Sequence, residues 1–272
     1  MTDRAAFVAA IEADPDNDLP RLVFADWLDD TGDARNRVRA ALIRVQCSTK
    51  AGTVGREQSL LTAVTRIWPA ELRVPWREFR RGFPRGLQTT ANDLANTRRR
   101  FAGREPMLDV ELSASHLGFG PVDQLVRLAA GDDLWPVTRL DGYHLAPLFV
   151  SRHLERLTAV VTHSPTDICW MSRSPSPFAL ASLSVTFFSR PEPGVGREVA
   201  DALACDPRYA RLERLELHHV GLSRHEVAIL VASRTLPPTA VVTVVEAEWR
   251  SDGDGPTAEA LAARFPGPLP AG

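Results

Sequence analysis

The sequence predicts an α/β fold: a small N-terminal helical module and a cap, followed by a short, irregular solenoid with a mostly parallel sheet backed by helices. Three stretches share one hydrophobic spacing and each leads into a strand-like segment: Leu154-x-x-Leu157, Leu180-x-x-Leu183 and Leu212-x-x-Leu215-x-Leu217. Stretches rich in alanine and aliphatic residues, typical of helices, lie between the strands. A repeated strand-then-helix unit of this kind stacks into a sheet.

The second apolar position of each unit gives the phase of the repeat: Val110, Leu140, Leu157, Leu183 and Leu215. Regular leucine-rich repeats occupy about 20–29 residues, and only some of these intervals conform. The stretches therefore resemble degenerate leucine-rich repeats, and the strand-then-helix order is that of the ribonuclease-inhibitor-like form. We expect helices over 122–130 and 197–204, and a last strand over 241–245 that closes the array.

The first fifty residues carry three amphipathic helical patterns. Their expected buried faces are Phe7, Val8 and Ile11 in the first helix, Leu19, Val23 and Trp27 with Leu22 and Leu28 alongside in the second, and Val38, Leu42 and Val45 in the third. Pro20 suits the first turn of the second helix, and Gly32 suits its left-handed exit. The third helix is expected to end near Cys47.

Part of this region is similar to a known family. The run LPRLVFADWLDDTGD over 19–33, followed by ALIRVQ over 41–46, closely resembles the bacterial repeat-companion domain. The resemblance covers roughly the first fifty residues, and segment 37–40 departs from the family pattern. That module is known as an N-terminal companion of leucine-rich repeats and implies no known catalysis. The run FRRGF over 79–83 also resembles the connector that follows it in related proteins.

These observations divide the chain into four parts. We expect a helical repeat-companion domain over 1–49, a connector and cap over 50–106, the leucine-rich-repeat region over 107–250 and a flexible tail over 251–272. The cap would cover the open apolar edge of the first repeat, as solenoids require. Its apolar residues are Leu60, Leu61, Val64 and Ile67 at helical spacing, then Trp68, Trp76 and Phe79.

Composition limits the class of protein. The formal net charge is -2, which predicts no general affinity for nucleic acids or membranes. The three cysteines, Cys47, Cys169 and Cys205, have no short C-x-x-C spacing, so a disulfide framework or zinc knuckle is not expected. No apolar run approaches the roughly 18 residues of a membrane span, and the first residues lack a signal-peptide pattern. We expect a cytoplasmic protein.

Two groups of residues suggest a metal site. Asp26, Asp29, Asp30 and Asp33 cluster near the end of the second helix, but the calcium-loop spacing is missing, which favours a solvated or helix-end polar network. His163, His218, His219 and His225 form the second group. Adjacent histidines on a strand point to opposite faces, and the position four residues after His225 holds Ile229 instead of a second histidine. We expect no metal.

Other catalytic patterns are incomplete. Gly194-Val195-Gly196 precedes a helix, but Val199 replaces the third glycine of a dinucleotide fingerprint. The chain has no Gly-Lys-Ser/Thr phosphate loop and no G-x-S-x-G elbow. We expect no cofactor, no catalytic residues and no enzyme activity.

The predicted function is therefore a protein-protein interaction scaffold. Residues between the inward anchors should face the concave surface and contact an unidentified protein; they are Glu111, Asp141, Tyr143, Thr158, Val160, Ser184, Thr186, Glu216 and His218. The alternative is a nucleic-acid-associated adaptor that uses the arginine-rich region 77–104. There Arg77, Arg80, Arg81, Arg85, Arg98, Arg99, Arg100 and Arg104 alternate with Trp76, Phe79, Phe83 and Phe101.

Overall fold

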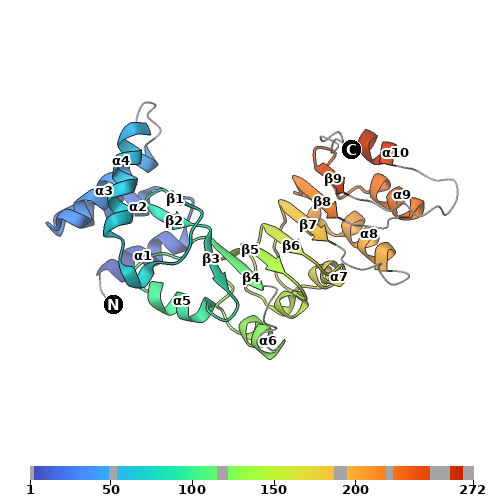
Figure 1. The fold of residues 1–272 in the computed structure, drawn as a ribbon, viewed down its shortest axis with the longest axis horizontal. Helices are drawn as coiled ribbons and strands as arrows, with labels where there is room; N and C mark the ends of the chain where they lie inside the picture. Colours follow the sequence, from blue (N-terminus) through green and yellow to red (C-terminus); the bar gives the residue numbers. More distant parts are fainter. Residues whose placement is uncertain are drawn as a thin grey trace. The chain divides into compact units, whose positions relative to one another are not determined.

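The computed structural model describes residues 3–48, 54–114, 122–186, 195–218, 223–245 and 258–265. The chain forms two compact units. Unit 1 is Met1–Thr89 with Asp93–Val110, and unit 2 is Thr90–Asn92 with Glu111–Gly272. Figure 1 shows the order of the elements along the chain, and each unit is described by itself.

Unit 1 begins with four helices: α1 (Asp3–Ala13), α2 (Leu19–Asp30), α3 (Ala34–Cys47) and α4 (Val54–Ile67). A short 3-10 helix, a two-stranded hairpin, a further strand and a helix follow: η1 (Ala70–Leu72), β1 (Glu78–Arg80), β2 (Phe83–Arg85), β3 (Leu87–Thr90) and α5 (Leu94–Phe101). The three helices predicted in the first fifty residues are confirmed, including the end of the third at Cys47.

The predicted buried face is right for α1 and only partly right for α2. Leu19 and Val23 are 64% and 44% exposed. Leu28 is buried as predicted, and Trp27 is half-buried against the core. The buried stripe of α2 also includes Arg21 and Phe24, which lie at helical spacing from Leu28. Arg21 can be buried there because its guanidinium donates at 2.5 Å to each of two main-chain carbonyls in the preceding turn.

The FRRGF run forms the β1–β2 hairpin. Its two turn residues, Arg81 and Gly82, have φ of 52° and 81°, the left-handed conformation of a type I′ turn. A Cβ on Gly82 would lie 2.1 Å from Cγ1 of Ile43, so the turn is pressed against α3. The Gln46 side chain accepts from the Gly82 N–H at 2.6 Å and donates to the Phe79 carbonyl at 3.0 Å. The hairpin is thus fixed to the third helix.

A buried ion pair lies at the centre of unit 1. The Glu105 carboxylate, which follows α5, accepts two hydrogen bonds from the Arg39 guanidinium of α3. It also accepts one from Arg4 of α1 at 2.5 Å. The Arg39 guanidinium lies 4.9 Å and 5.1 Å from the ring centres of Trp68 and Phe83. Through these contacts, Arg39 connects three parts of the unit.

Unit 2 alternates strands with helices. Its elements are β4 (Val110–Ala114), α6 (Val122–Ala130), β5 (Val137–Gly142), η2 (Ala146–Val150), β6 (Ala159–Thr162), α7 (Thr166–Ser172), β7 (Ser182–Thr186), α8 (Val195–Cys205), η3 (Pro207–Tyr209), β8 (Arg214–His218), α9 (Arg224–Ala232), β9 (Val241–Val245) and α10 (Ala258–Arg264). The predicted helices over 122–130 and 197–204 correspond to α6 and α8. The predicted last strand is β9.

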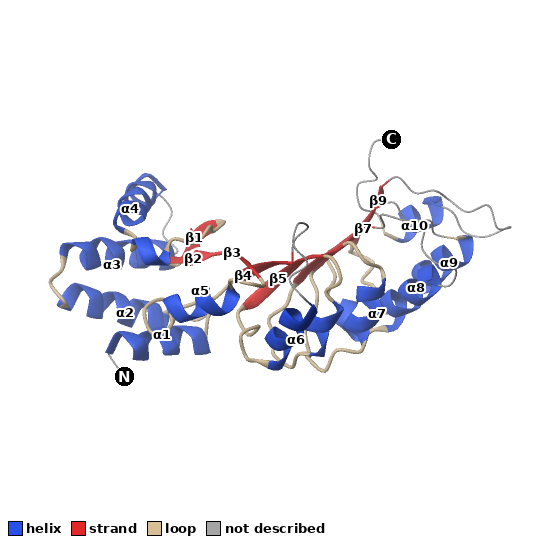
Figure 2. Cartoon of the chain, turned by 60° about the horizontal axis from the view of Figure 1, so that its bottom comes forward, coloured by secondary structure: helices blue, strands red, loops and turns tan. Residues whose placement is uncertain are grey.

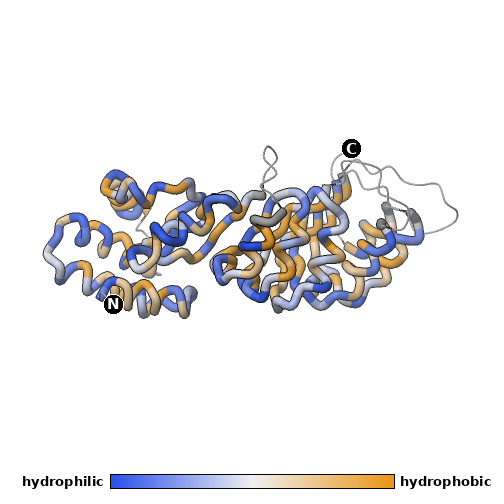
Figure 3. The backbone as a smooth tube through the Cα atoms, turned by 90° about the horizontal axis from the view of Figure 1, so that it is seen from below, coloured by the Kyte–Doolittle hydropathy of each residue, from blue (hydrophilic) through white to orange (hydrophobic). Residues whose placement is uncertain are grey.

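The strands form one parallel sheet in the order β3-β4-β5-β6-β7-β8-β9. In unit 2 the helices lie on one side of this sheet (Figure 2), and hydrophobic segments recur along the chain between hydrophilic loops (Figure 3). The parallel sheet backed by helices is therefore confirmed. The sheet begins at β3, inside the segment 50–106 where the sequence predicts only a connector and cap.

One buried residue of each strand sits in register across the sheet: Leu140, Val160, Leu183, Leu215 and Val242. Val160 is 1% exposed, so the prediction that it faces outward is wrong. The error comes from a misaligned repeat. Leu157 is buried in the turn before β6 and corresponds to Leu180 and Leu212, not to Leu183 and Leu215.

Two arginine side chains donate hydrogen bonds to main-chain carbonyls of the preceding strand-helix unit. Arg208, in η3, donates to the Ser172 and Ser174 carbonyls at 3.2 Å and 2.5 Å, at the end of α7. Arg264, in α10, donates to two carbonyls just after α9, each at 3.3 Å. The end of α7 leaves the Ser172 carbonyl without a helical partner, and Arg208 satisfies it.

Helix α10 lies in the segment predicted to be a flexible tail. Leu261 and Phe265 are buried, and Arg264 holds the helix to the preceding repeat. Residues 258–265 are therefore packed, because the alanine-rich stretch presents two large apolar side chains on one face. In the described part of the chain, no helix combines the length and apolar character needed to cross a membrane.

We predict that Glu105→Gln lowers the free energy of unfolding by about 3–5 kcal/mol, because it leaves the buried Arg39 charge without its partner. Glu71→Gln is the control, since Glu71 forms an exposed ion pair with Arg104 at 3.4 Å and should change stability by less than about 1 kcal/mol. Urea unfolding of both variants measures the difference. Equal losses would contradict the central role of Glu105.

The phase of β6 can be tested with two neighbouring valines. We predict that Val160→Asn costs about 3 kcal/mol of stability, because an amide would be buried without an assured hydrogen-bond partner. Val161→Asn should cost less than about 1 kcal/mol, because Val161 is half-buried on the other side of the strand. Thermal unfolding is the measurement, and a larger loss at Val161 would reverse the assigned phase.

Candidate functional site

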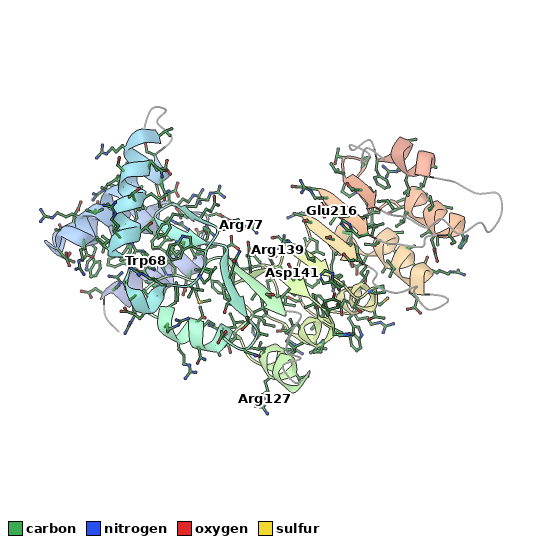
Figure 4. All side chains as sticks on the ribbon, viewed as in Figure 1. Trp68, Arg77, Arg127, Arg139, Asp141 and Glu216 are labelled. Atoms are coloured by element: carbon green, nitrogen blue, oxygen red, sulfur yellow. The ribbon has the colours of Figure 1, made fainter. Side chains whose placement is uncertain are left out.

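The candidate site is the side of the unit 2 sheet opposite the helices, which we call the open face. Figure 4 shows Arg139, Asp141 and Glu216 on this side, whereas Arg127 of α6 lies on the helix side. In β5 to β9, one side of each strand carries buried residues that point to the helices. The residues that alternate with them point to the open face. They are half-buried or exposed, so their side chains are accessible among the described residues of unit 2.

The strand register arranges these positions in rows. The first row is Arg139, Ala159, Ser182, Arg214 and Val241, and the second is Asp141, Val161, Ser184, Glu216 and Thr243. In the third row Thr186 pairs with His218, and Tyr143 and His163 follow directly after β5 and β6. Successive rows are about 6.7 Å apart along the strands, and neighbouring strands are about 4.8 Å apart.

Two columns of the open face repeat one order of chemical types: a base, an acid and a ring. On β8 they are Arg214, Glu216 and His218. The Glu216 carboxylate lies 3.9 Å from the Arg214 guanidinium and 3.7 Å from His218 Nε2. Such partly exposed pairs contribute about 1 kcal/mol or less. They set the charge pattern of the face and contribute little to the stability of the fold.

The matching column starts on β5 and consists of Arg139, Asp141 and Tyr143. The Tyr143 ring packs on the His163 ring with centroids 4.6 Å apart. His163 Nε2 also lies 3.8 Å from an Asp141 oxygen. The aromatic end of this column therefore consists of Tyr143, which follows β5, and His163, which follows the adjacent strand β6.

The structure brings six of the nine predicted binding residues together on the open face: Asp141, Tyr143, Ser184, Thr186, Glu216 and His218. Glu111 is half-buried on β4 and alternates with buried Val110 and Leu112. Thr158 is exposed but precedes β6, where its N–H donates to the Thr138 carbonyl at 2.9 Å. Val160 faces the core and does not belong to the face.

Sequence reasoning missed several residues of the face: Arg139, Val161, His163, Arg214 and Thr243. A sequence signal for Val161 and His163 does exist. Leu180 and Leu212 each precede the buried anchor of the next strand by three residues, and Leu157 precedes Val160 by the same distance. Aligning Leu157 with Leu180 places Val160 on the inside and therefore its neighbours outside. Arg139 and Arg214 follow from the same alternation.

The acidic group of α2 is held by an arginine. Arg44 of α3 donates to Asp26 at 2.7 Å and Asp29 at 2.5 Å, and these bonds raise the pKa of Arg44 above its ordinary value. Asp33 accepts from the Arg35 N–H at 2.8 Å and caps α3. The described residues contain no group of three or more His, Cys, Asp and Glu arranged for a metal; His219 lies outside them.

The glycine motif before α8 also has a structural partner. A Cβ on Gly196 would lie 2.6 Å from an oxygen of Glu226 in α9. This carboxylate accepts from the Ser223 N–H at 2.6 Å, and the Ser223 hydroxyl accepts from the Glu226 N–H at 3.2 Å, which makes a capping box. A carboxylate of this chain therefore lies against the first turn of α8, where a phosphate would have to bind. Gly194 lies outside the described residues.

The buried titratable groups of the described chain are ill suited to nucleophilic chemistry. Burial and the nearby Asp18 raise the pKa of the Cys47 thiol to about 11, and burial and Glu198 raise the pKa of Cys169. Burial also raises the pKa of Asp167, although its carboxylate accepts from the Leu145 and Ala146 N–H groups at 3.1 Å and 2.9 Å. Asp167 fastens the loop after β5 to α7.

Three of the four aromatic residues of the arginine-rich region are not available for base stacking, and the fourth, Trp76, is half-buried. Phe79, Phe83 and Phe101 are buried, and Phe79 packs edge-on against two tryptophans. Arg81 lies 3.2 Å from Asp18 in an ion pair. What remains is a set of arginines at the surface of unit 1, including Arg99, whose side chain donates to Asn96 at 2.5 Å.

Comparison with protein-family models, curated proteins and solved structures finds no match to the chain. Its assignment therefore depends on its residues and their arrangement. The chain is an α/β protein with an N-terminal four-helix module and a seven-stranded parallel sheet whose strands alternate with helices.

Two helices begin with the same four residues, Val-Gly-Arg-Glu, which provides a matched test of the Gly196 contact. Nothing lies within 4 Å of a Cβ built on Gly55 in α4, so Gly55→Ala should raise the free energy of unfolding by about 0.4–1 kcal/mol. Gly196→Ala should lower it by about 0.5–2 kcal/mol, because Glu226 must leave its capping position. Urea unfolding measures the free energy of unfolding of both variants. If both substitutions stabilise the protein, the close contact between Gly196 and Glu226 is wrong.

Proposed function

We propose that the chain is a nonenzymatic bacterial protein of the cytoplasm that binds another protein on its open face. The observation that carries the proposal is a parallel sheet with helices on one side only, within the described part of unit 2. Parallel sheets are usually covered on both faces. In repeat solenoids, an uncovered sheet face is the usual binding surface.

The resemblance of the first fifty residues to the repeat-companion domain supports this proposal. Under it, the four-helix module is that domain and the sheet is a degenerate array of ribonuclease-inhibitor-like leucine-rich repeats. Realignment brings two intervals within the usual repeat length of about 20–29, because Val160 is 20 residues from Leu140 and 23 from Leu183.

The chemistry of the open face fits a protein partner better than a polyanion. Asp141 and Glu216 place two carboxylates beside two guanidinium groups, and such a mixture gives no continuous positive surface for phosphates. Tyr143 supplies an aromatic ring, a residue type enriched at the centres of protein interfaces. The six face residues predicted from sequence, together with Arg139, Val161 and Arg214, make up the proposed site.

A second candidate function is nucleic-acid binding by the arginines of 77–104. The observation in its favour is Arg98, Arg99 and Arg100 in the last turn of α5. Because three of the four neighbouring rings are buried, this binding would depend mainly on phosphate contacts and should fall steeply with salt. It therefore ranks second.

We predict that Tyr143→Ala combined with Glu216→Ala weakens binding of a protein partner at least about tenfold, because both side chains project from the face. Arg99→Ala combined with Arg100→Ala is the control and should leave this binding unchanged. Affinity capture with nuclease-treated lysate, followed by titration of the captured protein, measures both effects. Loss of a nuclease-sensitive ligand in the arginine variant alone would favour the second candidate.

A further inference from the structure

We propose that the partner presents an α-helix, which lies lengthwise over β6 and β7 between the two charged columns. The inference rests on the proposed function and specifies the partner that the open face fits. It follows from the lengths of the outward side chains, the spacing of the strands and the order of the charges.

The middle of the open face carries short side chains. In the first two rows, β6 contributes Ala159 and Val161, and β7 contributes Ser182 and Ser184. Longer side chains stand on either side, on β5 and β8. These two strands are three spacings apart, which is about 14 Å. A helix with its side chains is about 10–12 Å wide, so it can contact both columns, whereas an extended strand is too narrow.

The charges define what this helix must carry. Arg139 precedes Asp141 by two residues on β5, and Arg214 precedes Glu216 by two residues on β8. The Cα atoms of each base and the next acid are thus about 6.7 Å apart along the strand, close to the rise of about 6 Å between helix positions i and i+4. Complementary pairing requires an acidic and a basic residue four positions apart.

Both columns have the same order of charges, so the requirement applies to both flanks of the partner helix. Its central stripe must be small or weakly polar to approach Ala159, Val161 and Ser184. At the carboxyl ends of the strands, the Tyr143 and His163 rings, which pack against each other, favour an apolar side chain at the end of the helix. The predicted ligand is therefore a helix with a small-residue stripe between two flanks of paired opposite charges.

The probes are two displayed peptide libraries of about 18 residues, roughly five helical turns. One is built on a helix-forming framework with randomised outer positions, and the other is linear and unstructured. Both are selected against the full chain. The test variant is Asp141→Arg with Glu216→Arg, which makes both columns wholly positive. The control, Glu155→Arg with Asp201→Arg, makes the same charge change at exposed positions outside the rows.

We expect the helical library to yield peptides with acid-base pairs four residues apart on both flanks, and at least tenfold weaker binding to the test variant but not to the control. If the linear library instead yields the stronger binders, and their binding depends on Asp141 and Glu216, the claim that the partner is a helix is wrong. The proposal that the open face binds a protein would then still stand. The helical-partner proposal would also be wrong if selected helical peptides bind the test variant as tightly as the unmodified chain, or if neither library is enriched. A dimer of the chain abolished by the test variant would assign the face to a second copy.

Discussion

The register of the parallel sheet is the constraint on which the functional face depends. Leu140, Val160, Leu183 and Leu215 point to the helices and lie opposite one another on successive strands. Because side chains alternate across a strand, burying this line of residues fixes the outward positions on either side of it. A shift of one residue in β5 or β8 would exchange its charged outward side chains for apolar ones. The two matching columns of base, acid and ring therefore exist only in this register.

Unit 1 is organised differently, around a charge instead of a row of aliphatic residues. The Glu105 carboxylate binds Arg39 and Arg4, and aromatic rings surround the Arg39 guanidinium. A buried pair of this kind adds little net stability over an apolar core, but either charge alone is costly. The pair thus fixes how α1, α3 and the segment after α5 fit together, since other arrangements would leave a charge without a partner.

Much of the fold could be predicted from the sequence, because it depends on local patterns. The face of α1, the exit at Gly32 and the bounds of α6 and β9 follow from apolar spacing and turn residues. The errors occur where two alignments fit equally well. Leu157 fits the pattern Leu-x-x-Leu as well as Leu183 does, and the pairing with β5 and β7 selects the alignment that places Val160 on the inside. The burial of Arg21 and the contact between Gly196 and Glu226 join residues that no local pattern connects.

The most direct test of the account is to place a photoreactive side chain at single positions and find which positions crosslink a bound protein. The account predicts crosslinks from Val161 and Ser184, in the middle of the open face. It predicts none from Trp170, which is 42% exposed on α7 on the helix side, or from Arg99 of unit 1. Crosslinks from Trp170 or Arg99 with none from Val161 and Ser184 would contradict the assignment of the open face as the binding surface.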